Sequence, residues 1–284
     1  MTSHLPDPQR PGIELPAAVC DDDPLVVALR RAGCVFAEAE ASLLHENASG
    51  PDELDEWRAR RVAGEPLEHI VGRVRFGDLC LSVGSGVFVP RQRSLLLAEH
   101  AVRAVRERAN PIVLEAFCGV APIAATVAAA VRGTRLHVAD IDDTALVHAR
   151  RNLPDHARVH HGPGLEGVPT GLRGRLDVIA AVPPYVPDPA FDLLAHEARD
   201  HEPRRALTGG ADGLDHVTAL VDDAREWLSG SGVLLVEMNV AQFGAIARRE
   251  RGRDLDIDAI AGDDGQTVVA RLRRRTASSQ SGRH

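Results

Sequence analysis

The sequence predicts a doubly wound α/β fold with a mostly parallel sheet. From residue 111 to residue 272, short apolar segments of strand character alternate with helical patterns, as in folds built of strand–helix–strand units. We expect strands at 112–117, 136–140, 159–161, 176–182, 232–238 and 267–272. A second observation is the apolar run that ends at Pro183-Pro184 and Tyr185, the only tyrosine of the chain. Two prolines bar a helix, so this strand must leave in a stiff, extended turn.

Helical patterns fill the intervals between these strands. They are expected at 94–108, 123–131, 144–152, 212–227 and 241–251. In open α/β sheets, ligands bind outside the carboxyl ends of the strands. The chemistry of this chain is therefore expected in the turns that follow the strands.

The region before the sheet divides into three parts. Residues 1–23 are rich in proline and aspartate and are expected to be disordered. Residues 24–63 show apolar positions at helical spacing and predict a small helical domain. Residues 64–92 contain short β-rich segments at 73–76, 79–83 and 87–89 and predict a β-hairpin linker. The main domain is then expected at 93–273, followed by a polar, disordered tail at 274–284.

The composition favours a globular cytoplasmic enzyme. The 284 residues are 44% hydrophobic and 26% charged, and no apolar run approaches the roughly 20 residues that span a bilayer. All 33 basic residues are arginines, and the net charge of −8 argues against non-specific nucleic-acid binding. Arginine clusters at 58–61 and 248–251 could bind RNA locally, but are more simply solvated helix faces.

Four separated cysteines and scattered histidines predict no metal site. A monomer is expected.

A candidate nucleotide-binding loop follows the first strand. It runs from Glu115 through Cys118 and Gly119 to Ala121, and opens a helix. Helix-end amides and a close backbone approach suit such a turn to a nucleotide-like ligand. Only Gly119 remains of the glycines that usually allow this approach, so an ordinary strand-to-helix turn is the alternative. Cys118 could be a thiol of lowered pKa, but a small buried residue is the simpler expectation.

Asp140 ends the second strand, about 20 residues after the first loop. A carboxylate at this position can accept hydrogen bonds from both hydroxyls of a ribose. Asp142 or Asp143 is expected to cap the next helix, and the two roles are compatible. The third strand leads into Gly162-Pro163-Gly164, where any adenine contact would be apolar or through the backbone.

A glycine-rich segment precedes the helix at 212–227. It begins at His201-Glu202-Pro203 and predicts a tight surface turn. His201 and Glu202 could form an acid–base pair. A structural role for Glu202, which would buttress a substrate pocket, is the simpler expectation.

Together these segments resemble the protein N5-glutamine methyltransferase family, which methylates the glutamine of release factors. The resemblance covers about 250 residues, from Pro24 to Leu272. Its motifs are Gly64-Glu65-Pro66-Leu67-Glu68-His69-Ile70-Val71-Gly72, Phe76-Gly77, Val87-Phe88-Val89-Pro90-Arg91, Ala139-Asp140-Ile141 and Glu202-Pro203-Arg204-Arg205-Ala206-Leu207.

The resemblance implies a Rossmann-like methyltransferase domain with a seven-stranded sheet, preceded by a helical substrate-docking domain. It implies S-adenosylmethionine (SAM) as cofactor and S-adenosylhomocysteine as product, with a release factor or a small molecule as substrate. By position, it assigns the cofactor to Glu115, Phe117, Cys118, Gly119, Val120, Ala121, Asp140, Ile141, Gly162, Pro163 and Gly164. It assigns the methyl acceptor to Val182, Pro183, Pro184 and Tyr185, and other substrate contacts to Phe88, Pro90, Arg91 and Glu202.

Several positions depart from the family's pattern. Val182 stands where the family has the asparagine of Asn-Pro-Pro-Tyr, Ala121 replaces a glycine, and Pro163 replaces an acidic residue. Ser94-Leu95 replaces an expected Thr-Glu pair. Losing the hydrogen-bond acceptor that this asparagine provides could slow methyl transfer on the order of 10²-fold. Three functions stay open: a SAM-dependent N-methyltransferase acting on an amide or other nitrogen, a methyltransferase fold repurposed for a small apolar substrate, and a catalytically inactive binding protein.

Overall fold

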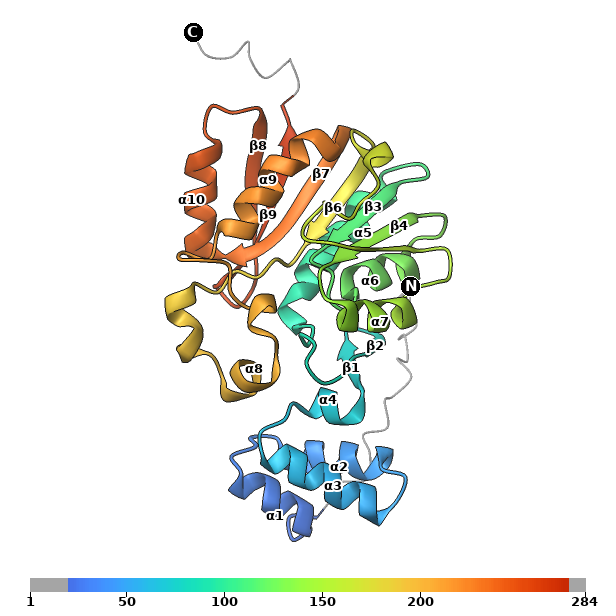
Figure 1. Cartoon of the computed structure of the whole chain (residues 1–284), viewed down its shortest axis with the longest axis vertical. Helices are drawn as coiled ribbons and strands as arrows, with labels where there is room; N and C mark the ends of the chain where they lie inside the picture. The colour runs from blue at the N-terminus through green and yellow to red at the C-terminus, as the bar shows by residue number, and fades with distance from the viewer. Residues whose placement is uncertain (1–19, 276–284) are drawn as a thin grey trace, which may run out of the picture. The chain divides into compact units, whose positions relative to one another are not determined.

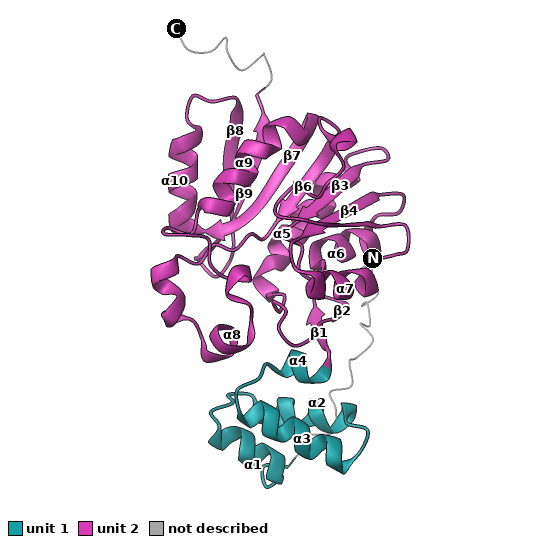
Figure 2. Cartoon of the chain, viewed as in Figure 1, with its two compact units in different colours: residues 1–71 teal, residues 72–284 magenta. Residues whose placement is uncertain are grey.

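The computed structural model describes residues 20–275. The chain forms two compact units, residues 1–71 and 72–284, described here over 20–71 and 72–275 (Figure 2). Of the segments predicted to be disordered, 1–19 and 276–284 lie outside the described residues. Within the described range, no helix has the length and apolar character needed to cross a membrane.

The described part of the first unit is helical. Its helices are α1 (Pro24–Arg31), α2 (Ala37–Asn47), α3 (Pro51–Val62) and α4 (Leu67–Val71). Asp23 caps α1, because its carboxylate accepts a hydrogen bond from the backbone nitrogen of Leu25 at 2.7 Å. The helices share a small core that contains Leu25, Val26, Leu29, Leu44, Trp57 and Ile70. Since α4 belongs to this unit, the helical region extends beyond residue 63, where the sequence pattern places its end.

The second unit begins with a β-hairpin. β1 (Arg73–Phe76) and β2 (Leu79–Ser82) pair antiparallel. Asn152 fastens the hairpin to the main domain, because its side chain bonds both the backbone nitrogen (2.7 Å) and the carbonyl (3.0 Å) of Ser82. The expectation of a further β segment at 87–89 is wrong. The backbone nitrogen of Val89 donates to the carboxylate of Glu202 at 3.3 Å instead of to a neighbouring strand.

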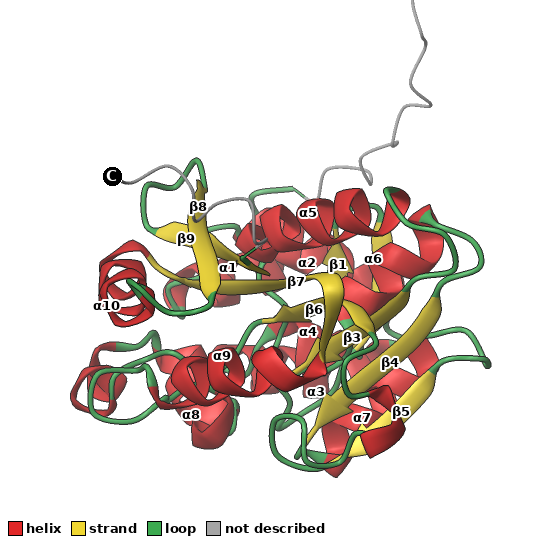
Figure 3. Ribbon diagram, turned by 90° about the horizontal axis from the view of Figure 1, so that it is seen from above, coloured by secondary structure: helices red, strands yellow, loops and turns green. Residues whose placement is uncertain are grey.

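A seven-stranded sheet forms the centre of this unit, in the order β5-β4-β3-β6-β7-β9-β8 (Figures 1 and 3). Neighbours from β5 to β7 pair in parallel, whereas β9 is antiparallel to both β7 and β8. The predicted doubly wound, mostly parallel sheet is therefore confirmed. The strands are β3 (Ile112–Ala116), β4 (Arg135–Asp140), β5 (Arg158–His161), β6 (Leu176–Ala181), β7 (Leu228–Asn239), β8 (Leu255–Ala261) and β9 (Thr267–Arg274).

Helices cover both faces of the sheet, and Figure 3 shows α5 and α9 on opposite sides of the strands. One face packs against α5 (Leu95–Arg106), α6 (Pro122–Ala130) and α7 (Asp143–Asn152). The other packs against α9 (Asp215–Trp227) and α10 (Val240–Glu250). Strands buried on both faces become nearly continuous apolar runs, which explains the sequences of β3 and β6. Short helices occupy Gln92–Ser94, Thr170–Leu172, Asp188–Leu193, His196–His201 (α8) and Arg204–Ala206.

The sequence pattern does not predict β8. This strand lies at the edge of the sheet and pairs with β9. Of its seven residues only Leu255 is buried. An edge strand with one buried side chain lacks both the apolar run and the strict alternation that mark a strand in a sequence.

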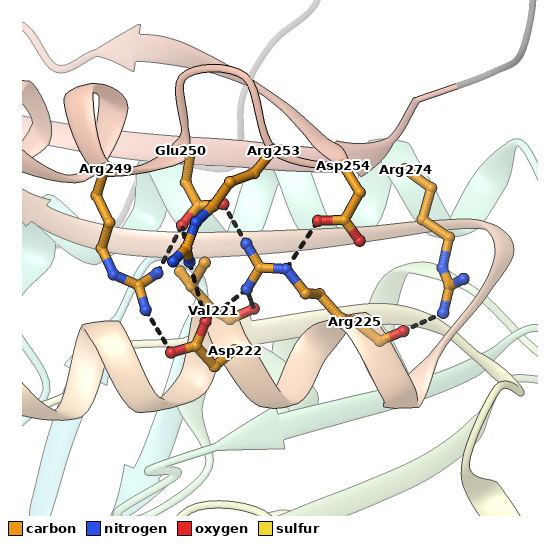
Figure 4. Close-up of polar contacts among 8 residues, drawn as sticks. All are labelled: Val221, Asp222, Arg225, Arg249, Glu250, Arg253, Asp254 and Arg274. Atoms are coloured by element: carbon orange, nitrogen blue, oxygen red, sulfur yellow. Dashed lines mark hydrogen bonds and ion pairs between the residues drawn. The ribbon is translucent and has the colours of Figure 1, made fainter.

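An arginine–carboxylate network joins α9 to α10 (Figure 4). The Glu250 side chain is fully buried and accepts hydrogen bonds from Arg225 and, at 2.6 Å, from Arg249. Arg225 also donates to Asp254 at 2.9 Å. Removing one partner of a buried ion pair leaves an uncompensated charge, so the packing of these two helices depends on Glu250.

Candidate functional site

A cavity of about 220 Å³ lies at the carboxyl edge of the parallel strands. From β3 the chain adds β4 and β5 on one side and then crosses to add β6 on the other side, so the order of strand addition reverses between β3 and β6. Ligands of doubly wound sheets bind at such a switch point. The walls consist of Phe88, Phe117, Gly119, Asp140, Ile141, Asp142, Pro163, Gly164, Val182, Pro184, Arg205, Ala206, Thr208 and His216.

Most of the residues expected to hold a cofactor are therefore neighbours in space. Others in the same loops face elsewhere. Cys118, Val120 and Ala121 are at most 2% exposed and belong to the core beneath the loop. Burial raises the pKa of the Cys118 thiol well above its ordinary value, which is the opposite of what a thiolate nucleophile needs.

The loop after β3 keeps a backbone shape that normally requires glycine. Its φ angles are +53° at Phe117, +51° at Gly119 and +63° at Ala121. A side chain in this left-handed region costs about 1–2 kcal/mol per residue. The loop thus has the course of a three-glycine turn but carries side chains at two of the three positions.

Phe117 directs its ring along the wall of the cavity. A Cβ atom placed on Gly164 would lie 4.0 Å from the ring carbon Cζ of Phe117. On another side, the ring centroid lies 5.5 Å from that of His216, with the planes tilted by 55°. The ring therefore lies between the loop after β5 and the start of α9.

Asp140 links two of the loops. Its Oδ2 accepts a hydrogen bond from the backbone nitrogen of Gly119 at 2.7 Å, and its Oδ1 accepts from that of Asp142 at 2.9 Å. Burial raises the pKa of this carboxyl, and the two amide donors oppose the rise. Asp142 in turn caps α7 through the backbone nitrogen of Thr144, as expected from the sequence.

Glu115 supports the first loop from below. It is 2% exposed and does not line the cavity. Its two oxygens accept hydrogen bonds from the backbone nitrogens of Ile123 (3.2 Å) and Ala124 (2.6 Å), in the first turn of α6. Burial raises the pKa of Glu115 to about 8, against the effect of these donors. The carboxyl group is thus a cap of α6, which positions the loop without touching the cavity.

The turn after β6 contacts two cavities. A second cavity of about 80 Å³ is lined by Arg91, Arg93, Pro183 and Tyr185, among others. Phe88, Val182 and Pro184 line both cavities, so the two spaces meet at this turn.

Tyr185 is held through both its backbone carbonyl and its side-chain hydroxyl. Its carbonyl accepts a hydrogen bond from Nε2 of Gln242 at 2.8 Å. Its hydroxyl donates to Oε1 of Glu237 at 3.4 Å, and Arg93 Nε lies 3.5 Å from the same oxygen. Burial and the nearby Glu237 raise the pKa of Tyr185, whereas Arg93 lowers it.

The glycine-rich segment packs directly against this turn. A Cβ atom on Gly209 would lie 2.3 Å from the carbonyl oxygen of Pro184. A Cβ atom on Gly213, whose φ is +77°, would lie 2.1 Å from the carbonyl oxygen of Tyr185. The segment expected to be a surface turn is therefore the support of the turn after β6.

Glu202 has a structural partner in Arg91. Its carboxylate is buried and accepts two hydrogen bonds from Nη2 of Arg91, at 2.7 and 2.8 Å. Arg91 also lies over the Phe88 ring, 4.8 Å from its centroid. This ion pair holds the 88–91 segment at the two cavities, which gives Glu202 the buttressing position expected from the sequence. Pro90, next to Arg91, is buried but lines neither cavity.

Sequence reasoning missed several residues of the site. Glu237, Arg93 and Gln242 hold Tyr185, and His216 contacts Phe117. Arg205 donates to Asp142 at 2.8 Å across the cavity. Of these residues, Gln242 is marked in the sequence as part of a helix start, because it stands three residues after Asn239 in a capping-box pattern before α10. Among the described residues, no group of three or more His, Cys, Asp or Glu side chains could hold a metal ion.

Comparisons with known proteins find release factor glutamine methyltransferases. The one from Streptomyces coelicolor is 38% identical over 191 residues, which make up 66% of this chain and 68% of that protein. The one from Corynebacterium glutamicum is 31% identical over 236 residues, or 81% and 80% of the two chains. No protein-family model matches the sequence.

Among solved structures, the hMettl16 catalytic domain, crystallised with the MAT2A 3'UTR hairpin 6, has the same fold. Its TM-score is 0.52 at 13% identity, over 78% of this chain and 83% of that one. The sheet topology is that of a Rossmann-like fold, and the relatives define the class of protein as SAM-dependent methyltransferases. At the identities and coverage found, the chain belongs to the release factor glutamine methyltransferase family. The family resemblance seen in the motifs is thereby confirmed.

Proposed function

We propose that this protein transfers a methyl group from SAM to the amide nitrogen of a glutamine in a protein substrate, for which a release factor is the first candidate. One observation carries the proposal: two cavities meet at the turn formed by Val182, Pro183, Pro184 and Tyr185. Methyl transfer requires the donor and the acceptor to be held together in one orientation. A turn at the end of a central strand, open to a cavity on each side, suits that task.

The first cavity fits the cofactor in its position and in its polar groups. Asp140 ends the second parallel strand and would hold the ribose hydroxyls, because each carboxylate oxygen can accept more than the one hydrogen bond it has. Ile141, Pro163 and Gly164 would flank the adenine. When bound, SAM supplies the activated methyl group on its sulfonium. The chain's own contribution is then mainly orientation and exclusion of water.

The second cavity would hold the acceptor. Pro183 and Pro184 restrict the backbone of the turn, and the carbonyl of Pro183 would accept a hydrogen bond from the acceptor amide. Tyr185 would pack against the acceptor while Glu237 and Arg93 keep its ring in place. The side chain of Val182 offers no acceptor, so the amide would be oriented by a backbone carbonyl and by packing against Phe88.

One observation favours a second candidate, a small apolar substrate. Phe88, Val182, Pro184, Leu194 and Leu207 line the second cavity. An apolar wall at the reacting point suits a ligand that is bound by burial rather than by hydrogen bonds. The same fold and cofactor would then serve different chemistry.

The first test measures cofactor binding. Calorimetric titration with S-adenosylhomocysteine should show binding to the wild type and its loss in Asp140→Ala. Asp143→Ala is the matched control, because this carboxylate is three residues away, 84% exposed and outside the cavity. Absence of binding at millimolar ligand would refute the methyltransferase proposal and leave a catalytically inactive binding protein, which would use residues 24–63 to hold a partner.

The second test concerns the acceptor. Labelled methyl groups should pass from SAM to a release factor or to a glutamine-containing peptide, and not to the same peptide with asparagine. Cofactor binding without either transfer would favour the small apolar substrate. The proposal also includes a cytoplasmic, monomeric protein without non-specific nucleic-acid binding, to be checked by light scattering and by titration with random-sequence RNA.

A further inference from the structure

We propose that Phe117 is a gate of the cofactor cavity: its ring occupies space that the cofactor needs and must move before the cofactor binds. The inference rests on the proposed function, because it concerns the same site. It assigns to one side chain the control of cofactor affinity in this chain.

The backbone at position 117 does not require an aromatic residue. With φ at +53°, the position has the conformation that glycine adopts without strain. A bulky residue is a genuine outlier in this region, so phenylalanine is here in spite of the backbone. The side chain, rather than the loop geometry, must account for its presence.

The ring lies where a flat ligand group would lie. It is bounded by Gly164 on the loop proposed to flank the adenine, and by His216 on α9. A nucleoside base is also a flat aromatic group, and the proposed adenine site includes the same Gly164. Phe117 and the base therefore compete for one space.

The volume of the cavity agrees with this competition. Sites for ligands of drug or cofactor size measure roughly 300–1,000 Å³. The cavity here measures about 220 Å³ with the ring in place. Displacing the ring adds the volume of a phenyl group at the Gly164 end without any change in the strands.

The ring is not enclosed in the core. Phe117 is only partly buried, at the margin of the core cluster under α9. A rotation about its side-chain bonds would carry the ring away from Gly164. If the open arrangement is a minor state, the apparent affinity for the cofactor falls in proportion to its population.

The test compares S-adenosylhomocysteine binding to the wild type, Phe117→Gly and Phe117→Tyr by calorimetry. Phe117→Gly removes the ring and relieves the backbone strain. It should bind S-adenosylhomocysteine at least about 10-fold more tightly than the wild type, as expected if the open state of the wild type is populated at 10% or less. Phe117→Tyr keeps the ring and should bind like the wild type. Adenosine alone should show the same gain with Phe117→Gly, because the ring lies at the adenine end.

Thermal unfolding controls for the fold of each variant, and Phe117→Ala replaces Phe117→Gly if the glycine variant does not fold. Equal affinities of wild type and Phe117→Gly would overturn the gate and leave the methyltransferase intact. Weaker binding by Phe117→Gly would also overturn it, because the ring would then be a stacking wall of the site. No binding by any variant, including the opened one, would overturn both the gate and the proposed function.

Discussion

The pH dependence of stability should reveal the state of the buried Glu115. This carboxyl group is 2% exposed and its pKa is raised to about 8, mainly by burial. The folded-state value lies above the ordinary 4.5, so the protonated form is the one that folding favours. Its contribution to stability is fully present below pH 4.5 and is lost as the pH rises toward 8.

The magnitude follows from proton linkage. Where the folded state holds one proton more than the unfolded state, the free energy of unfolding falls by about 1.4 kcal/mol per pH unit. In the Glu115→Gln variant this group no longer titrates. We therefore expect the free energy of unfolding of the wild type to fall relative to that of Glu115→Gln between pH 5 and pH 8.

Urea denaturation of both proteins at several pH values measures this difference. Trp227 belongs to α9 in the second unit, whereas the other tryptophan, Trp57, lies in the first. Fluorescence in a Trp57→Phe background thus follows the unit that contains Glu115. Parallel curves, or a wild type that gains stability relative to Glu115→Gln as the pH rises, would refute the reasoning, since Glu115 would then be ionised in the folded state.

Two further predictions concern the support of the site and the fold. Gly213→Ala should abolish methyl transfer and spare S-adenosylhomocysteine binding, because its Cβ would lie 2.1 Å from the Tyr185 carbonyl. The control is Gly133→Ala, where φ is +79° but the surrounding space is open, and this variant should retain methyl transfer. An equal loss of methyl transfer in both variants would show that backbone strain, and not the contact with Tyr185, is the cause. Glu250→Ala should lower the free energy of unfolding by about 3–5 kcal/mol in urea denaturation, whereas Glu226→Ala, in an exposed pair, should lower it by less than about 1 kcal/mol. Similar losses of unfolding free energy in the two variants would show that the buried position of Glu250 adds nothing to its contribution to stability.

The order of strands and helices was predictable because each central strand is buried on both faces. β3 and β6 are apolar along nearly their whole length, and helical spacing marks α5 and α9. Such patterns are local, so they can be read without knowing what packs against them. β8 was not predictable for the same reason, since its exposed edge position removes the pattern.

The candidate site was predictable in part. The positions of Phe117, Asp140 and Val182 follow from the ends of parallel strands, which must meet at one edge of the sheet. The roles of their neighbours were not predictable. Glu115 lies two residues before Phe117, but its carboxyl group faces the first turn of α6, and only the direction of the side chain separates a helix cap from a ligand contact.

The doubly wound sheet, the family and the turn at Pro183-Pro184 can be read from the amino-acid sequence, because strand burial, motif spacing and the fixed φ of proline are properties of short stretches of chain. Tertiary structure alone decided that Gly213 supports Tyr185, that Glu202 binds Arg91 and that the ring of Phe117 stands in the cofactor cavity. These contacts join residues from separate elements or depend on where a side chain points. They arise only when the whole sheet has brought its loops together.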